Sequence, residues 1–384
     1  MSKISVKLLH NAVAPYRTPL FNALAQKTDL KVVFCSAGDR DRKWSSKVKD
    51  GIFSFSTMRG YRFGPFTFNP FLWGEVWQTR QDVLIAVDHE ENIFTNLIFC
   101  SWMKLRGKPY VLWSGQIPVE GGTVHPADFH DTIFHRVKPI RWLYFALVNV
   151  CIRLLYRGAD SFLAYSDASK RHMVAKGADA RKIVVGTQAM PTVTLTKSTT
   201  KRRKSSTLRL LYLGYLRPEK GVDVLVSAVK NLPEAKIELN IIGDGPEKQR
   251  LKDLSAGSKN IHFHPYAEGL EKANWFAASD AFVLPTFYDP WAHVVAESLY
   301  YETPVIITDS AAASMVITDY QNGVVVKAGD AKGLQAVFQK LIDHPNLVQQ
   351  MQKGAAKQNP RLYDVNADAE NFVKAIRIAQ NEAD

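Results

Sequence analysis

The stretch 280–308 (DAFVLPTFYDPWAHVVAESLYYETPVIIT) constrains the fold more than any other part of the chain. Its short apolar runs at 281–284 and 305–308 are typical of buried strands. Between them, Asp289 is predicted to be the N-cap of a helix and Pro290 its first residue, because that N–H has no intrahelical partner to lose. A buried strand, a helix and a second buried strand in this order favour an α/β fold with a parallel sheet.

The same alternation of buried strand and helix runs through the rest of the sequence. Further strands are predicted at 4–9, 30–34, 82–87, 110–113, 161–164, 182–185, 208–213, 237–242, 261–264 and 324–327. Residues 191–207 (PTVTLTKSTTKRRKSST) are basic, rich in Ser and Thr, and almost without large apolar side chains, which is typical of a linker. We therefore predict two Rossmann-like domains, 1–192 and 208–362, joined by a linker at 193–207.

Three other segments complete the predicted architecture. Residues 37–76 are rich in aromatic residues and glycine, and they predict only loop and short strands. In the second domain, a helix is predicted at 266–278, and 331–342 is predicted to be the last amphipathic helix. The C-terminal segment 363–384 is predicted to be helical as well.

Composition limits the classes of protein to which the chain can belong. Its 384 residues suffice for two domains with sizeable cores, and its 46% hydrophobic content is ordinary for a globular protein. No stretch approaches the roughly 20 apolar residues of a membrane span, and no signal peptide opens the chain. Cys35, Cys100 and Cys151 lack metal-binding spacing, and an odd number of thiols favours a reducing compartment. We therefore expect a cytoplasmic location.

The net charge of +12 favours anionic partners, either phosphates, acidic lipid or nucleic acid. Segment 134–156 is apolar almost all round and carries basic residues near its ends, but the uninterrupted run between Arg141 and Arg153 is too short to span a bilayer. It predicts either an ordinary helix buried in the first domain or a helix on an anionic membrane surface. The second alternative would make the protein peripheral at the inner face of the cell membrane.

The loop after the first predicted strand lies at the edge at which α/β sheets bind ligands. Tyr16 and Arg17 lie in this loop, so Arg17 is either a site residue or a surface arginine. The βαβ opening lacks the GxGxxG fingerprint, and a dinucleotide cofactor is therefore not indicated.

A second ligand-binding loop is predicted after the strand 208–213. Gly214 permits a tight turn, and Lys220 stands at the mouth of the following helix. A cation beside the unpaired N–H groups of a helix start is suited to clamp a diphosphate.

Asp289 and Glu297 would lie about 80° apart around the predicted helix and ~12 Å apart along it. That separation suits an elongated, hydroxyl-rich ligand, with the helix N-terminus binding an anion between the two acids. The alternative is that Asp289 only caps the helix and Glu297 is a solvated acid.

Three motifs occur in the order GYLRPEKG (214–221), IIGDGPE (241–247) and DPWAHVVAE (289–297). Together they resemble the GT-B retaining glycosyltransferases of family 4, the glycosyl transferases group 1. The resemblance covers nearly the whole second domain and the last third of the first. It implies two Rossmann-like domains facing each other across a cleft, with 363–384 crossing back to the first domain.

The resemblance also implies roles for individual residues of the second domain. Lys220 and Arg217 would hold the nucleotide diphosphate, with backbone N–H groups at Trp291, Ala292, His293 and Val294. Asp289 would bind the donor sugar, Glu297 the ribose and Tyr266 the base. The sequence departs from the family pattern at Tyr215, where an arginine is usual, and at Ala292, Glu302 and 311–313, where glycines are usual.

In the first domain, the strand end at which many family members carry a histidine has Ser114 instead. The polar residues that follow it provide replacement candidates for the cleft, chiefly Gln116 and His125.

The resemblance implies a retaining transfer of a sugar from a UDP- or GDP-sugar to a glycan or polyprenyl-linked acceptor. No metal cofactor is expected, because the sequence has no DxD-type motif at a strand end. One alternative is a nucleotide-sugar epimerase or hydrolase of the same fold, which would release an epimer or free sugar. Another is a non-enzymatic basic protein that binds polyanions or membranes; the absence of nucleic-acid-binding motifs argues against a nucleic-acid partner.

Overall fold

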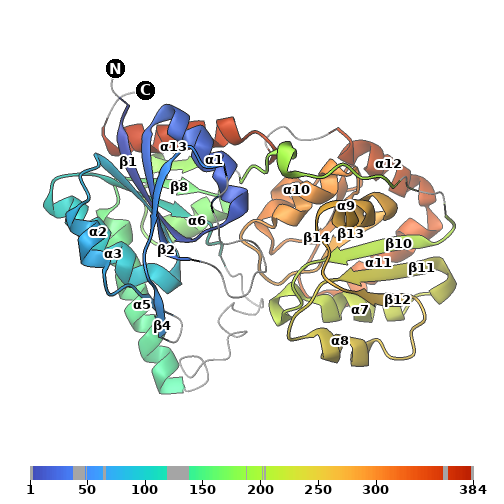
Figure 1. Cartoon of the computed structure of the whole chain (residues 1–384). Helices are drawn as coiled ribbons and strands as arrows, with labels where there is room; N and C mark the ends of the chain where they lie inside the picture. Colours follow the sequence, from blue (N-terminus) through green and yellow to red (C-terminus); the bar gives the residue numbers. More distant parts are fainter. Residues whose placement is uncertain are drawn as a thin grey trace. The chain divides into compact units, whose positions relative to one another are not determined.

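The computed structural model describes residues 3–37, 48, 50–63, 66–118, 138–186, 188–200, 202, 205–357 and 362–381. These residues form two compact units (Figure 1). Unit 1 contains the described residues up to Pro118, from 138 to Ala189 and from Asp364 onward, and unit 2 contains those of Met190–Tyr363. Each unit is built on its own parallel sheet, so the predicted α/β fold with two Rossmann-like domains is confirmed.

Unit 1 has a seven-stranded parallel sheet in the order β3-β2-β1-β6-β7-β8-β9. Its strands are β1 (Ser5–Ala12), β2 (Asp29–Ser36), β3 (Ser54–Thr57), β6 (Val83–Val87), β7 (Tyr110–Ser114), β8 (Ser161–Ala164) and β9 (Ile183–Val185). Strand order reverses between the neighbours β1 and β6. The carboxyl ends of these two strands therefore form the switch point at which such sheets bind ligands.

Helices cover this sheet: α1 (Thr18–Lys27), α2 (Leu72–Trp77), α3 (Ile93–Leu105), α5 (Lys138–Gly158), α6 (Asp167–Ala175) and α13 (Val365–Ala379). Helix α3 packs against α5, and a small antiparallel hairpin of β4 (Tyr61–Phe63) and β5 (Phe66–Phe68) lies against α3. Residues 37–76 were predicted without a helix. They contain α2 because its Leu72 and Val76 are buried in the core of unit 1.

Helix α13 belongs to the core of unit 1, although the stretch Met190–Tyr363 of unit 2 precedes it in the sequence. It packs against α1 and the strands β7, β8 and β9. Its Phe372 ring lies 4.8 Å from the ring of Trp113, and its Ala375 carbonyl accepts a hydrogen bond from Ser161 Oγ at 2.6 Å. Unit 1 is thus assembled from segments that are distant in the sequence.

Unit 2 has a six-stranded parallel sheet in the order β12-β11-β10-β13-β14-β15. Its strands are β10 (Leu208–Leu213), β11 (Ile237–Ile242), β12 (Ile261–His264), β13 (Ala281–Leu284), β14 (Val305–Thr308) and β15 (Gly323–Val326). Its helices are α7 (Val222–Lys230), α8 (Lys248–Leu254), α9 (Gly269–Ala278), α10 (His293–Tyr300), α11 (Ala331–Asp343) and α12 (Pro345–Ala355). Strand order reverses between β10 and β13, which form the switch point of this unit.

Two predictions about the helices of unit 2 were wrong. Helix α11 was predicted to be the last amphipathic helix of the domain, but α12 follows it. The sequence of α12 is mostly polar, and only Val348, Met351 and Ala355 are buried. Helix α9 begins at Gly269 rather than at residue 266.

The segment 193–207, predicted to be a linker, is bound to unit 2 where it is described. Ser198 Oγ donates a hydrogen bond to Asn274 Oδ1 of α9 at 2.8 Å. The Arg202 guanidinium donates to Thr303 Oγ1 at 2.9 Å. This segment therefore has fixed protein partners rather than solvent alone.

His10 lies near the carboxyl end of β1, buried among the rings of Phe21, Phe34 and Trp113. Burial lowers the pKa of His10 to about 3, and the nearby charge of Arg17 acts in the same direction. An unfolded histidine takes up a proton near pH 6.5. Between these two pH values the unfolded chain binds the extra proton, so acid favours unfolding.

We expect the substitution His10→Gln to flatten the pH dependence of stability. Between pH 6 and pH 4, the free energy of unfolding of the wild type should fall by about 1.4 kcal/mol per pH unit more than that of the variant. Urea unfolding of both proteins at pH 7, 6, 5 and 4 measures this difference. Parallel curves would contradict the buried, neutral state of His10.

Candidate active site

Two loops meet at the switch point of unit 2. Residues 214–221 follow β10 and residues 285–292 follow β13, and these two strands pair in parallel. Lys220 Nζ in the first loop lies 2.7 Å from Asp289 Oδ2 in the second. The two side chains are only 24% and 14% exposed. A partly shielded cation and acid thus stand together at the sheet edge where a ligand is expected.

Thr286 holds these two loops together. Its side chain is buried, and its Oγ1 donates to the carbonyl oxygen of Glu219 at 2.9 Å. The backbone N–H of Phe287 donates to the same oxygen at 2.8 Å. Sequence reasoning missed Thr286, although the Pro-Thr turn after the strand was the available signal.

The loop after β11 packs against the loop after β10. Leu216 N donates to Asp244 O at 2.8 Å, and Glu247 N donates to Leu216 O at 3.1 Å. A Cβ on Gly243 would collide with the carbonyl oxygen of Gly214. The turn predicted at Gly214 therefore packs closely against the next loop because Gly243 has no side chain.

Asp289 does not cap α10, contrary to the prediction from its spacing. The helix begins at His293 and its N-cap is Ala292. Asp289 Oδ1 instead accepts the N–H of Trp291 at 3.1 Å, which closes a short local turn before the helix. The helical separation predicted for Asp289 and Glu297 therefore does not apply.

The residues before α10 adopt an uncommon backbone conformation. Ala292 has a φ of 63°, in the left-handed region, which costs an L-residue about 1–2 kcal/mol. Residues held in this way gather at functional sites. The Trp291 side chain is buried and its N–H is taken by Asp289, so the predicted backbone donors are reduced to those of the segment from Ala292 to Val294.

Glu297 lies on α10 and forms a second ion pair. Its Oε1 is 2.7 Å from Lys272 Nζ of α9, and the two side chains are 13% and 23% exposed. Glu297 is therefore not the solvated helix acid of the alternative interpretation. Sequence reasoning missed Lys272, which lies 25 residues away and in no recognised motif.

Two further donor-site candidates lie beside these pairs. The Arg217 guanidinium lies 5.0 Å from the ring of Tyr215 and 3.8 Å from Glu219 Oε1. Tyr266 is half exposed, its hydroxyl donates to Glu268 Oε2 at 3.3 Å, and partial burial raises its pKa. Both are exposed enough to meet a ligand.

In unit 1, Arg17 is buried, so its interpretation as a surface arginine is wrong. The guanidinium lies 4.8 Å from the ring of Trp113 and 5.0 Å from that of Tyr16. It donates to Tyr165 Oη at 3.0 Å and also to the side chain of Gln188. Arg17 thus joins the carboxyl-terminal loops of three strands of this sheet.

Gln116 and His125 were the other two candidates predicted in the first domain. Gln116 is partly buried, and its N–H donates to Ser114 Oγ at 3.1 Å. His125 lies outside the described residues. Sequence reasoning also missed Asp88, which follows β6 and accepts hydrogen bonds from Ser114 Oγ and Tyr156 Oη. Burial raises the pKa of Asp88.

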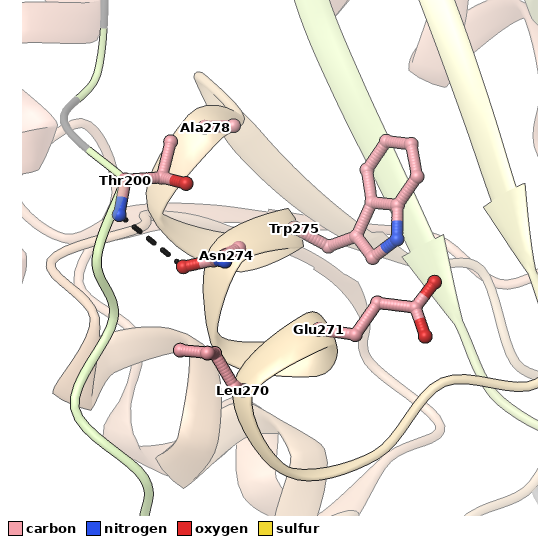
Figure 2. A pocket seen from close by; sticks show the side chains of 6 residues that line it. All are labelled: Thr200, Leu270, Glu271, Asn274, Trp275 and Ala278. Carbon is pink, nitrogen blue, oxygen red and sulfur yellow. Dashed lines mark hydrogen bonds between the residues drawn. The ribbon is translucent and has the colours of Figure 1, made fainter.

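An open groove of about 610 Å³ lies at α9, next to the segment that carries Thr200 (Figure 2). It is lined by Thr200, Leu270, Glu271, Asn274, Trp275 and Ala278. None of the predicted donor-site residues lines this groove. We therefore place the candidate site at the Lys220–Asp289 and Lys272–Glu297 pairs and not in this groove. The reason is that Lys220 and Asp289 lie in the loops after β10 and β13, the two strands of the switch point.

The described residues contain no group of three or more His, Cys, Asp or Glu side chains that could hold a metal ion. Within the same part of the chain, the search for a helix both long and apolar enough to cross a membrane found none.

Comparisons with known proteins agree with this geometry. Residues 196–358 match the family described as "Glycosyl transferases group 1". Sulfoquinovosyl transferase SQD2 of Arabidopsis thaliana is 26% identical over 242 residues, which are 59% of this chain and 46% of that protein. The lipopolysaccharide core biosynthesis glycosyltransferase LpsE of Rhizobium meliloti (strain 1021) is 29% identical over 136 residues, or 35% and 39% of the two chains. The chain thus spans about half, or less, of these curated relatives.

Solved structures resemble the chain over nearly its whole length. Sucrose-phosphate synthase from Thermosynechococcus elongatus superposes with a TM-score of 0.75 at 14% identity, covering 99% of this chain and 100% of that one. Anabaena HepE in complex with UDP and glucose gives 0.71 at 15% identity, covering 97% and 99%. The fold is therefore GT-B, as the resemblance implied. The resemblance to the glycosyl transferases group 1 is confirmed by the match of residues 196–358.

Proposed function

We propose that the protein is a retaining glycosyltransferase that moves a sugar from a nucleotide-diphosphate sugar to an acceptor hydroxyl. The observation that carries the proposal is the Lys220–Asp289 pair at the switch point of unit 2, with Glu297 on the adjoining helix α10. The family match of this unit supports it. So do the structural neighbours solved as complexes with UDP and with UDP-glucose.

The proposed chemistry needs fixed positive charge. When the bond between the anomeric carbon and the diphosphate breaks, its electron pair stays on the diphosphate oxygen and positive charge develops on the sugar. The acceptor oxygen forms the new bond on the same face of the sugar, and its proton passes to an oxygen of the departing diphosphate. Groups that are already oriented toward the departing diphosphate lower the barrier most. Lys220 and Arg217 would supply this charge, without a metal ion.

The other proposed roles rest on position. Asp289 has one carboxylate oxygen on Lys220 and would bind the hydroxyl groups of the donor sugar. Glu297 would accept hydrogen bonds from the ribose while remaining paired with Lys272, since a carboxylate offers about four acceptor sites. Tyr266 would contact the base. His293, Val294 and Ala292 would place backbone groups near the diphosphate, and Gly214 would allow its close approach.

We propose a lipid-linked or cell-envelope glycan as acceptor. The basic net charge supports an anionic or lipid-bound substrate. Two curated relatives are named for lipopolysaccharide core biosynthesis, and a third is named a sulfoquinovosyl transferase. Arg17, Tyr16 and Gln116 are the candidates in unit 1 for contact with substrates.

The proposal is tested by a thermal-shift screen of UDP, GDP and their sugars, because a ligand that binds only the folded state raises the melting temperature. The best ligand should lose about 10- to 100-fold in affinity in the variant Glu297→Ala, which lacks a charged acceptor of two hydroxyls. The double variant Glu297→Ala/Lys272→Ala separates this loss from the effect of an unpaired lysine.

Glu271→Ala serves as the matched control, because Glu271 lines the groove at α9, which contains none of the predicted donor-site residues. It should bind the nucleotide as the wild type does. A protein that binds none of the nucleotides, or one in which Glu271→Ala is the damaging change, would refute the assignment. Appearance of free sugar or an epimer in place of the glycosylated acceptor would refute the transferase.

A further inference from the structure

Helix α5 carries two apolar stripes on different faces. The first, at Tyr144, Val148, Cys151 and Leu155, is buried in the core of unit 1. The second, at Leu143, Leu147, Val150 and Leu154, is exposed, with fractions from 44% to 64%. Successive members of each stripe are three or four residues apart, so each forms a continuous line along the helix. A helix on the surface of a globular domain needs only the buried stripe, and the exposed one therefore calls for a partner.

Hydrogen bonds fix the rotation of α5 and keep the second stripe outward. Tyr144 Oη donates to Glu90 Oε2 at 2.9 Å. Tyr156 Oη donates to Asp88 Oδ2 at 2.8 Å. Both carboxylates belong to the loop after β6. Turning the exposed stripe inward would break both bonds, so exposure is built into the fold.

Exposed aromatic residues also occur on elements that neighbour α3 and α5. Trp142 is 73% exposed at the start of α5. On α2, Trp73 and Trp77 are also exposed, one helical turn apart. Tyr61 and Phe68 lie opposite each other in the hairpin and are 58% and 59% exposed. Helices α2 and α5 flank α3 in unit 1, and the hairpin lies close to α5 (Figure 1).

Helix α2 is anchored as firmly as α5. Lys7 of β1 is fully buried, and its Nζ donates to Thr79 Oγ1 at 2.6 Å and to the carbonyl of Glu75 at 3.1 Å. These bonds hold the end of α2 against the sheet, while Trp73 and Trp77 stay exposed to solvent. The backbone that carries Trp73 and Trp77 is thus tied to the sheet.

The charged residues of α5 indicate the kind of partner. The 21 residues of α5 include four basic side chains and no acidic one. Arg153 and Arg157 are exposed beside the apolar stripe. Tryptophan, tyrosine and arginine around an aliphatic stripe are the side chains that favour the headgroup level of an anionic bilayer.

We infer that the exposed stripe of α5, with the aromatic residues of α2 and the hairpin, is the surface by which the protein lies on an anionic lipid bilayer. The helix lies in the interface and does not span it, because its other stripe is part of the core. This inference rests on the proposed function and deepens it by naming where the transferase meets its lipid-linked acceptor. Lipid binding is measured without sugar transfer, so the two can fail separately.

A second copy of the chain fits this surface less well. A helix pairing through the stripe would join two helices that each carry four basic residues and no acidic one in their sequence. The stripe also covers only two heptads, fewer than a stable coiled coil needs. Both observations favour lipid phosphate as the partner.

Flotation of the full-length protein with vesicles tests this inference. Phosphatidylcholine vesicles with about 30% phosphatidylglycerol, which gives them a negative surface potential, should carry the protein at low salt. Pure phosphatidylcholine should carry much less. Leu147→Glu/Val150→Glu should lower binding to anionic vesicles by about tenfold or more. Arg153→Ser/Arg157→Ser should lower it by about 30-fold, because each basic residue near the surface contributes a factor of about five.

Val174→Glu is the control, because Val174 is 44% exposed on α6 and lies outside the surface. It should float like the wild type. All variants should keep the wild-type circular dichroism and nucleotide-induced thermal shift, which separates lost lipid binding from lost folding. Wild-type protein that stays at the bottom of the gradient would overturn the inference. So would a dimer, seen by light scattering, that Leu147→Glu/Val150→Glu converts to monomer.

Discussion

Replacing Lys220 by alanine should lower the rate of sugar transfer by about 100- to 1,000-fold, the usual cost of removing one oriented group from a developing negative charge. Its ammonium group stands at the switch point, 2.7 Å from Asp289, and is only 24% exposed. Water that fills the space cannot replace a fixed charge. Steady-state kinetics with the donor found by the thermal-shift screen measure the loss.

Lys230→Ala provides the matched control for this prediction. Lys230 lies in the last turn of α7, in the same unit, and its Nζ donates to the carbonyl of Leu254 at 2.8 Å, away from the paired lysines and acids. This variant should transfer sugar at the wild-type rate. Lys220→Ala should remain folded, as its circular dichroism can show, because the hydrogen bonds of Thr286 still join the two loops. Near wild-type turnover in Lys220→Ala would remove Lys220 from the site.

The substitution Gly221→Ala should lower the free energy of unfolding by about 3 kcal/mol or more. Gly221 has a φ of 62°, in the left-handed region, and a Cβ there would collide with the carbonyl oxygen of Pro285. Two costs therefore add: strain in the backbone and separation of the two loops that Thr286 joins. Urea unfolding measures the change.

Gly269→Ala separates these two costs. Gly269 has a similar φ of 55°, but a Cβ there would meet no atom within 4 Å. Only the backbone strain remains, so this variant should lose about 1 kcal/mol. Equal losses in the two variants would show that the contact with Pro285 does not matter.

The strands of unit 2, and the two loops that bring Lys220 and Asp289 together, could be predicted from the sequence. Buried strands leave continuous apolar runs, and the predicted bounds of β10 to β15 agree with the structure to within one residue. The start of α10 could not be predicted in the same way. Asp289-Pro290 has the pattern of a helix start, but the Asp289 side chain binds Trp291 N and Lys220, and the helix begins only after the left-handed Ala292.

The sequence mainly failed to predict contacts between residues that are distant in the chain. Lys272 has no motif, and only the packing of α9 beside α10 brings it to Glu297. Asp88 follows the predicted strand 82–87 and has the sequence context of an ordinary turn residue. In the structure, it accepts a hydrogen bond from Tyr156 of α5. For α5, the sequence left open whether the helix is buried or exposed to a membrane. The structure shows one apolar stripe of each kind, buried and exposed, on the same helix.

The position of α13 has a consequence for how the protein is made. The described part of unit 2 lies within one stretch of sequence, Met190–Tyr363, and can fold while the ribosome is still translating α13. Unit 1 cannot, because Phe372 must reach Trp113 before its sheet is covered. The nascent chain therefore carries an open apolar sheet face until Val365–Ala379 has left the ribosome, and a premature stop before α13 would spare unit 2 while leaving the sheet of unit 1 uncovered.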